Sequence, residues 1–187
     1  MTSALQPLAR SALWALALAA LPLPAAAQMR VSAQVSDLMQ GLFCAPQDTG
    51  RREAPDTMAG WIHVPDEPVR MVAEGAVAPA VLGLGFGVRF QRAGGDLVGL
   101  RYEVTHPPMG DGGLTRQGWD SLSQGGEWDA IFFQFDIPEE LLPGEWTFAA
   151  YDGAHELFHV PFTVVDPALA PELTGRCRGG ALLSLLR

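Results

Sequence analysis

The chain has 187 residues and a formal net charge of −9 at pH 7. This length suits one domain with a hydrophobic core of its own. An acidic protein is a poor partner for nucleic-acid phosphates and for anionic membrane surfaces, so the charge argues against nucleic-acid binding.

The N-terminal segment predicts export. Arg10 is the only charged side chain before an apolar run that ends in three alanines at 25–27. A basic start, an apolar core and small residues at the end are typical of a secretory signal peptide. A transmembrane anchor is the alternative, but the run is short and contains prolines, and no charge cluster follows it. We predict a signal peptide at 1–27, cleaved before Gln28, no membrane insertion afterwards, and a periplasmic or secreted protein.

The remaining chain, 28–187, has the pattern of short strands. Apolar residues alternate with polar ones, and Gly and Pro separate the segments. The predicted strands are 30–43, 57–64, 81–91, 96–106, 130–137, 145–151 and 155–165. About seven strands at such intervals predict an all-β fold, a single immunoglobulin-like β-sandwich.

The segments between the strands predict how they are joined. Residues 93–95, Ala-Gly-Gly, favour a hairpin between the third and fourth strands, and Asp152-Gly153 favours a hairpin between the last two. The polar, Gly-rich stretch 107–129 is expected to be a long loop. The fourth strand should bury one face, formed by Val98, Leu100, Tyr102 and Val104.

Two cysteines fall outside the region that is richest in strands. We divide the mature chain into a lead at 28–56, a sandwich domain at 57–166 and a tail at 167–187. Cys44 lies in the lead and Cys177 in the tail. In an exported protein, two cysteines predict one disulfide. Two free thiols or a redox pair are the alternatives, although redox pairs usually have C-x-x-C spacing.

The segment HELFH, at 155–159, matches the H-E-x-x-H pattern of zinc peptidases. In those enzymes His155 and His159 would bind zinc from one face of a helix, and Glu156 would activate a water. Here a turn precedes the motif and Pro161 follows it, which favours a strand. On a strand, the two histidine Cα atoms would be about 13 Å apart, too far for one tetrahedral zinc ion. We therefore expect no metal site.

Two further motifs are interpreted as structural. The glycines at 83, 85 and 87 resemble a phosphate-binding loop, but strand follows them rather than helix, so they predict a smooth strand face that another backbone or ring approaches. His106, Pro107 and Pro108 predict a corner at the end of a strand. A copper site using His106 and Met109 is the alternative, but no suitable Cys and second His accompany it.

Tryptophans suggest a candidate binding loop. Trp119 and Trp128 flank the polar stretch GWDSLSQGGEW, and tryptophan is enriched at binding hot spots. The alternative is that both rings fold back over the sandwich as a plug. Trp61 and Trp146 lie in predicted strands and are expected in the core.

The order of several short segments resembles the bacterial family called domain of unknown function 3859. The shared segments are L-G-x-x-F-G at 82–87, V-x-H-P-P at 104–108, P-G-x-W-x-F at 143–148 and a closing F-x-V at 162–164. The resemblance covers roughly 57–166. It implies a small, β-rich, exported protein and supplies no catalytic residues to transfer. It also implies that the His-Pro-Pro corner is a structural feature of the family.

The sequence thus favours an exported, non-enzymatic binding or interaction module without a cofactor. Its partner would be a protein or small ligand of the cell envelope. One alternative is a zinc hydrolase that uses the HELFH motif. The other is a structural envelope protein whose apolar tail, Leu182 to Leu186, docks on a partner.

Overall fold

The computed structural model describes residues 27–44, 50–66 and 68–177. The predicted signal peptide, apart from Ala27, and the apolar tail from Leu182 to Leu186 lie outside these residues. Export and tail docking therefore stay predictions. None of the helices in the described ranges is long and apolar enough to cross a membrane.

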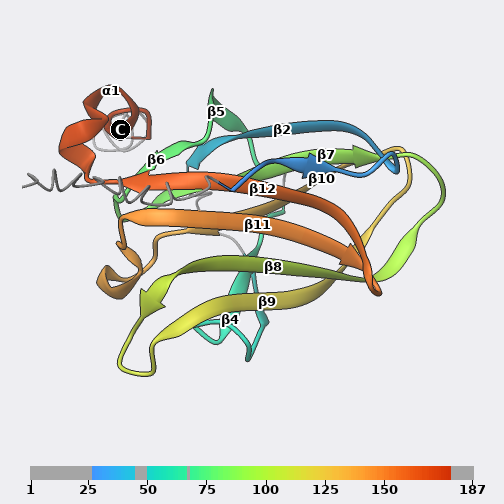
Figure 1. Cartoon of the computed structure of the whole chain (residues 1–187), viewed down its shortest axis with the longest axis horizontal. Helices are drawn as coiled ribbons and strands as arrows, with labels where there is room; N and C mark the ends of the chain where they lie inside the picture. Colours follow the sequence, from blue (N-terminus) through green and yellow to red (C-terminus); the bar gives the residue numbers. More distant parts are fainter. Residues whose placement is uncertain (1–26, 45–49, 67, 178–187) are drawn as a thin grey trace, which may run out of the picture.

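The chain folds as two facing antiparallel sheets, which confirms the predicted all-β sandwich (Figure 1). The larger sheet has the strand order β1-β12-β11-β8-β9, with β6 pairing in parallel with β12. Its strands are β1 (Arg30–Val31), β6 (Val77–Pro79), β8 (Leu97–Met109), β9 (Leu114–Ser123), β11 (Gly144–Asp152) and β12 (His155–Val165). The smaller sheet has the order β10-β7-β2-β5. Its strands are β2 (Val35–Cys44), β5 (Met71–Glu74), β7 (Leu84–Arg92) and β10 (Trp128–Gln134).

A separate two-stranded hairpin lies beside the sandwich and consists of β3 (Gly50–Glu53) and β4 (Trp61–Val64). The helical elements are the 3-10 turns η1 (Pro138–Glu140) and η2 (Pro167–Leu169) and the single turn α1 (Pro171–Thr174). The described residues contain twelve strands, not about seven. Each predicted strand has a counterpart, and the predicted strand 30–43 corresponds to β1 and β2. Of the four strands that were not predicted, β3, β5 and β6 are too short to show an alternating pattern, and β9 lies in the expected loop.

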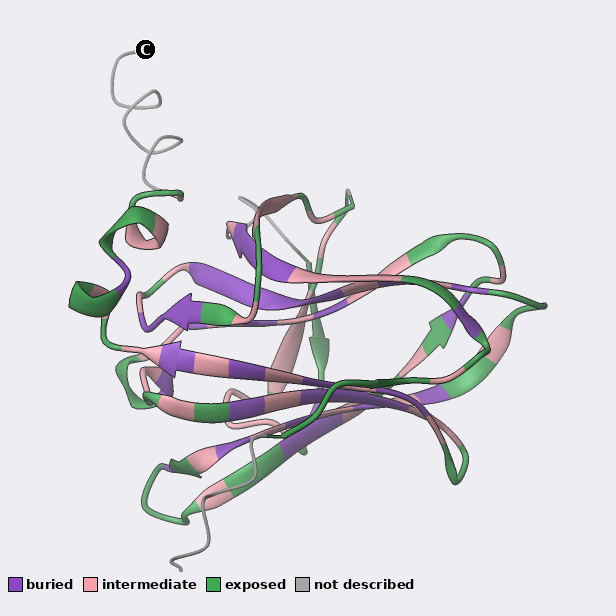
Figure 2. Cartoon of the chain, turned by 45° about the horizontal axis from the view of Figure 1, so that its top comes forward, coloured by how far each residue is buried: buried purple, intermediate pink, exposed green. Residues whose placement is uncertain are grey.

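Aromatic side chains fill the space between the two sheets. In β7, Phe86, Val88 and Phe90 are fully buried, and the rings of Phe86 and Phe90 contact aromatic rings of the larger sheet. Figure 2 shows buried segments, in purple, along strands of both sheets. The Phe86 ring lies 5.4 Å from that of Trp146, between centroids, and 5.3 Å from that of Phe148. Burial of each such side chain stabilises the fold by about 1.5–3 kcal/mol. This core fixes the two sheets face to face.

The lead is part of the sandwich rather than a separate segment. Strand β2 lies inside the smaller sheet, between β7 and β5. Cys44 at its end forms a disulfide with Cys177, across 133 residues and with Cα atoms 5.2 Å apart. The predicted disulfide is confirmed. It joins the end of a sheet strand to the chain that follows α1.

The predicted hairpin at 93–95 is wrong. β7 and β8 belong to different sheets, and the turn carries the chain from one to the other. Both edges of β7 are already paired, with β2 and β10, so β8 has no free edge to join. The buried guanidinium of Arg92 fixes the crossing, because it donates to the carbonyl oxygens of Gly95, at 2.7 Å, and Ser123, at 3.3 Å.

The predicted long loop at 107–129 is also wrong in most of its length. β8 continues to Met109 and β9 pairs with it, so only 110–113 and 124–127 connect strands here. Gly110 and Gly113 adopt positive φ values of 62° and 61° in the first connection, which favours glycine. The polar composition that suggested a loop belongs to an edge strand, whose outer residues face solvent.

His106, Pro107 and Pro108 do not form a corner at a strand end. They lie within β8, where the register with β9 shifts between Thr105 and Met109. The three residues therefore bulge from the strand, and a proline is tolerated there because a bulge leaves its position without a ladder hydrogen bond. A second register shift, beside Gly99, moves Val98 to the surface, where it is 89% exposed, contrary to its predicted burial.

Strand β12 contains HELFH, and the predicted hairpin at Asp152-Gly153 joins it to β11. The strand prediction for this motif is confirmed. Leu157 is an extra residue in the register with β11, so the strand bulges there. The bulge places both Leu157 and Phe158 in the buried core, while Glu156 lies on the side of His159.

Gly87 is the point where neighbouring backbones approach β7 most closely. It pairs with Phe132 of β10 on one side and with Gly41 of β2 on the other. A Cβ atom on Gly87 would overlap with the carbonyl oxygen of Ile131 and the Cα of Phe132. The predicted close approach of another backbone to this glycine-rich strand is therefore found at Gly87.

Candidate functional site

A cavity of about 390 Å³ opens where the sandwich ends, between β9 and β10. These strands are the terminal strands of the two sheets on the same side of the molecule. Residues of the β3–β4 hairpin line the cavity as well, and Figure 1 shows β4 beside β9. The cavity is thus bounded by two sheet edges and by a small separate sheet.

Three hydrogen bonds fix the hairpin region to β9. The Gly118 N–H donates to the Asp56 carbonyl at 3.3 Å. The Met58 N–H donates to Gln117 Oε1 at 2.7 Å, and Arg52 Nη2 donates to the Asp120 carbonyl at 2.8 Å. The bonds of Gly118 and Asp120 use outward-facing backbone groups that an edge strand otherwise leaves unpaired.

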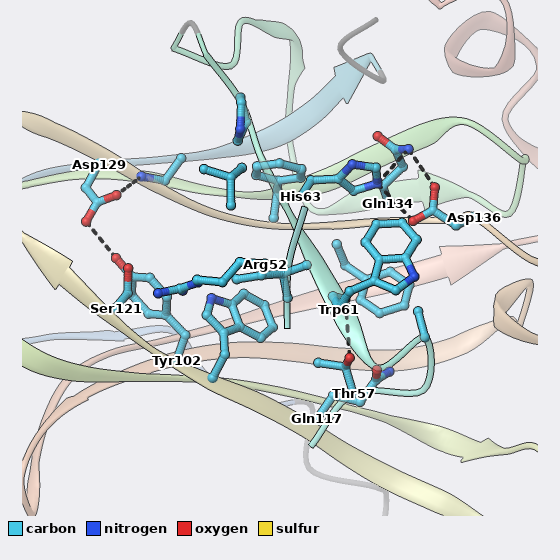
Figure 3. A pocket seen from close by; sticks show the side chains of 18 of the residues that line it. Arg52, Thr57, Trp61, His63, Tyr102, Gln117, Ser121, Asp129, Gln134 and Asp136 are labelled. Carbon is cyan, nitrogen blue, oxygen red and sulfur yellow. Dashed lines mark hydrogen bonds and ion pairs between the residues drawn. The ribbon is translucent and has the colours of Figure 1, made fainter. Parts of the chain in front are cut away.

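A polar cluster fixes the other side of the hairpin to the end of β10. His63 Nε2 on β4 lies 2.9 Å from Asp136 Oδ2, and Gln134 Nε2 lies 2.7 Å from Asp136 Oδ1. A carboxylate only accepts, so both nitrogens donate to Asp136. Figure 3 shows this cluster at one end of the cavity and Asp129 with Tyr102 at the opposite end.

At that opposite end, the Tyr102 hydroxyl donates to Asp129 Oδ2 at 2.7 Å, and the Ala130 N–H donates to Asp129 Oδ1 at 2.7 Å. Burial raises the pKa of the Asp129 carboxyl above its ordinary value, although these hydrogen bonds act in the other direction. Burial also raises the pKa of Tyr102, and the charge of Asp129 adds to the effect. The phenol therefore stays protonated and acts as a donor.

Glu140 lines the cavity beside Asp136, and the residue is only 3% exposed. Its Oε2 accepts from the N–H groups of Asp136, at 2.6 Å, and Ile137, at 3.2 Å, at the start of η1. Burial raises the pKa of this carboxyl to about 7 despite these two donors. The site therefore contains a carboxyl group that titrates near neutrality.

Aromatic rings supply the apolar wall. Trp61, Trp119 and Phe132 line the cavity. The guanidinium carbon of Arg51 lies 3.7 Å from the centroid of the Trp61 ring, and the His63 ring meets Trp61 edge-on at 4.8 Å. The cavity thus combines large apolar faces with a few fixed polar groups, which is the usual composition of a small-molecule site.

Only part of the tryptophan prediction agrees with the structure. Trp119 lies on strand β9, not in a loop, and it lines the cavity while its ring also packs on Tyr102. Trp128 begins β10, is 40% exposed, lies near Arg89, and does not line the cavity. Trp146 is fully buried, as predicted, whereas Trp61 is half-buried on the hairpin rather than in the core.

The HELFH residues lie elsewhere and make contacts of another kind. Glu156 pairs with Arg30 of β1, through two bonds of 2.8 and 2.9 Å, and Arg30 lowers the pKa of that carboxyl. His155 Nε2 lies 3.3 Å from Ser32 Oγ. Burial, together with the Arg30 charge, lowers the pKa of His159. Within the described residues, no group of three His, Cys, Asp or Glu side chains is arranged to hold a metal ion.

His106 has a structural environment next to the cavity. It is 6% exposed, its ring lies 4.9 Å from that of Trp146, and its Nε2 lies 3.0 Å from Gln117 Nε2. Burial lowers the pKa of His106, so the neutral ring can accept from Gln117. Since Gln117 Oε1 receives the Met58 N–H, the His-Pro-Pro bulge positions a residue that holds the hairpin.

The family comparison agrees with the resemblance seen in the sequence. The family model for a domain of unknown function, DUF3859, matches residues 31–164. The chain belongs to the DUF3859 family. The matched segment begins well before residue 57, where the sequence resemblance was placed, and so includes β2, the hairpin and Cys44. All of the cavity-lining residues fall inside this DUF3859 segment.

Comparison with solved structures finds an immunoglobulin-like protein from Pseudomonas aeruginosa. It is 19% identical, covers 75% of the DUF3859 chain and 99% of its own, and has a TM-score of 0.46. No curated protein matches.

Most of the residues at the cavity were not predicted as site residues. His63 comes from one segment and Asp136 and Glu140 from another, and only the fold brings the two segments together. Trp119 alone was identified, because two tryptophans beside a polar stretch are unusual. Asp136 was predicted to lie in the strand 130–137, and Glu140 lies in the segment 138–144, which was interpreted as a turn.

Proposed function

We propose that this chain is an exported binding protein that holds a small molecule of the cell envelope in the cavity beneath the β3–β4 hairpin. The observation that carries the proposal is the cavity itself, about 390 Å³ in volume. That volume lies within the range of small-molecule sites, about 300–1,000 Å³. A concave site of this kind suits a small ligand better than the flat surface of a protein partner.

The wall of the cavity supports selective binding. Trp61, Trp119 and Phe132 offer apolar faces, while Asp129 and Asp136 are held in place by hydrogen bonds from neighbouring side chains. Side chains fixed before binding lose little conformational freedom when a ligand arrives. Binding of this kind needs no catalytic group and no cofactor.

Export is supported by two independent features. The sequence at 1–27 has the composition of a signal peptide. The Cys44–Cys177 disulfide is of the kind that persists in oxidising compartments such as the periplasm. Fractionation of cells that produce the full chain is expected to place the mature protein, beginning at Gln28, outside the cytoplasm.

The test is native mass spectrometry of the mature chain, purified from the periplasm without an affinity tag. Ser121 lines the cavity from β9, so Ser121→Trp fills it with a side chain from the edge. Thr115→Trp is the matched control, because Thr115 is exposed on the same strand and does not line the cavity.

We expect a small-molecule adduct on the wild type and on the Thr115→Trp protein, and none on Ser121→Trp. If the purified wild type carries no adduct, binding is measured instead by a metabolite screen that follows the fluorescence of Trp61 and Trp119. Ligands that bind Ser121→Trp as well as the wild type, or a screen without hits, would contradict the proposal.

A further inference from the structure

The carboxyl groups of the cavity lie at both of its ends. Asp129 lies near the start of β10 at one end, and Asp136 lies after β10 at the other (Figure 3). Glu140 accepts a hydrogen bond from the Asp136 N–H and so lies beside Asp136. Strand residues advance about 3.3 Å each, so Asp129 and Asp136 are separated by on the order of 20 Å along the chain. An elongated ligand can thus meet a carboxyl group at either end.

The positive groups of the lining do not balance these acids. Arg52 is the guanidinium among the lining residues, and it donates to the Asp120 carbonyl on β9. His63 contributes its ring and donates to Asp136. Three carboxyl groups therefore share the lining with one guanidinium and one imidazole, and a ligand carboxylate or phosphate would meet like charges at both ends.

The hydrogen bonds to Asp136 and Glu140 leave acceptor capacity on both acids. Both backbone donors to Glu140 reach the same oxygen, Oε2. Each oxygen of Asp136 receives one donor, from His63 and from Gln134. A carboxylate offers about four acceptor positions in total. A ligand ammonium group, with up to three donors, fits this remaining capacity.

The aromatic wall of the cavity also favours a cation. An organic cation is attracted to the electron-rich face of an aromatic ring, and tryptophan is the strongest of the three aromatic residues in this respect. Arg51 already shows such a contact with Trp61, at 3.7 Å from the ring centroid. Trp61 and Trp119 both line the cavity.

We infer that the ligand of this cavity is an organic cation, an amine on an apolar body, whose ammonium group pairs with a carboxyl group while its body packs on the tryptophans. The inference rests on the proposed function and specifies the chemical class of its ligand. It excludes carboxylates and phosphates as ligands of this site. A neutral polyol is the alternative ligand, and the test must distinguish it from an amine.

Three probes of similar size and shape test the inference, namely 2-phenylethylamine, 2-phenylethanol and phenylacetate. Binding of each to the mature chain is measured by calorimetry at about pH 8, where the amine is charged and Glu140 is ionised. We expect the amine to bind at least roughly tenfold more tightly than the alcohol, and the carboxylate to bind more weakly than both.

Glu140→Gln and Asp136→Asn each remove one negative charge from the cavity. Each variant should lower the affinity for the amine roughly tenfold more than it lowers the affinity for the alcohol. Asp37→Asn is the control, because Asp37 is exposed on β2, away from the cavity, and its substitution changes the net charge equally. Glu140→Gln retains an acceptor for the two backbone N–H groups, so it keeps the test valid if Asp136→Asn does not fold.

Several results would overturn the inference. They are equal or tighter binding of the alcohol or the carboxylate, no binding of the amine, and an equal loss of amine affinity in Asp37→Asn. Such a result would leave the proposed function intact if another ligand still binds the wild type and not Ser121→Trp. If every ligand found binds the Ser121→Trp protein as tightly as the wild type, the proposed function is overturned as well.

Discussion

His63 on β4 and Asp136 just after β10 lie 2.9 Å apart, between Nε2 and Oδ2, and this contact joins the hairpin to the smaller sheet. On the other side, Arg52 joins the same hairpin to the larger sheet. One small element therefore bridges the terminal strands of both sheets. The cavity wall and the stability of this end of the sandwich depend on the same few bonds.

Removal of the disulfide should destabilise the chain. The bond between Cys44 and Cys177 closes a loop of 133 residues, so the chain-entropy account gives about 4–5 kcal/mol, and measured losses are often smaller. Urea unfolding of the oxidised and reduced mature chain measures the difference. A Cys44→Ser, Cys177→Ser variant should match the reduced wild type and should not respond to reductant. Equal stability of the oxidised and reduced wild type would contradict the prediction.

Gly87→Ala should be far more damaging than Gly85→Ala. A Cβ on Gly87 would overlap with backbone atoms of Ile131 and Phe132, whereas a Cβ on Gly85 would meet its nearest neighbour, the Phe133 carbonyl oxygen, at 3.4 Å. We expect a loss of more than about 2 kcal/mol for Gly87→Ala, or failure to fold, and less than about 1 kcal/mol for Gly85→Ala. Urea unfolding compares the two variants directly. Similar losses in both would show that the strands can separate at this point.

Glu140 should make the fold less stable as the pH rises through neutrality. Burial raises the pKa of this carboxyl from 4.5 to about 7, so the folded state binds more protons than the unfolded state between these values. The contribution of Glu140 is then fully present below about pH 4.5 and is lost as the pH rises through about 7.

Glu140→Gln removes this titration and keeps the acceptor at the start of η1. Between about pH 5 and pH 8, we expect the variant to gain on the order of 1–2 kcal/mol relative to the wild type. Urea unfolding at both pH values gives the comparison. Glu139→Gln is the control, because Glu139 is the exposed neighbour in the same turn. An equal difference between Glu140→Gln and wild type at both pH values would exclude the predicted titration.

The HELFH motif should not hold a stoichiometric zinc ion. His155 and His159 lie on a strand, about 13 Å apart between Cα atoms at ordinary strand spacing, and Glu156 is paired with Arg30. The metal content of the untagged mature chain, measured by mass spectrometry, should stay well below one zinc per chain. The His155→Ala, His159→Ala variant should contain the same amount. One zinc ion per wild-type chain, lost in the variant, would revive the peptidase interpretation.

The alternation of apolar residues was sufficient to predict the strands of the core. Tyr102 and Val104 on β8 face inward as expected, because a buried face repeats every second residue. The alternation did not show which of the two sheets each strand joins. The turn at 93–95 has the composition of a hairpin, and only the pairing of β7 on both edges shows that it crosses between sheets. Edge strand β9 was missed because its polar outer residues resemble a loop.

The candidate site was less accessible to sequence reasoning than the fold. Trp119 stood out by composition, but Asp136 is an ordinary acid near the end of a predicted strand and Glu140 an ordinary acid in a turn-like segment. Their role depends on which residues lie opposite, and His63 is separated from Asp136 by 73 positions in the sequence. No local pattern encodes a contact between segments this far apart. Trp61 was assigned to the core because its own segment does not reveal that it lies on a separate hairpin beside the sandwich.

The β3–β4 hairpin also covers the two sheet edges that are otherwise free on this side. β9 and β10 each end a sheet, and the hairpin region already uses the outward backbone groups of Gly118 and Asp120. If the hairpin were displaced, two adjacent rows of unpaired amide and carbonyl groups would face solvent, and such edges recruit strands from other molecules. A chain in which this hairpin is displaced would thus tend to self-associate while its aromatic core remained folded. In the cell, the aggregates would then consist of mostly native protein.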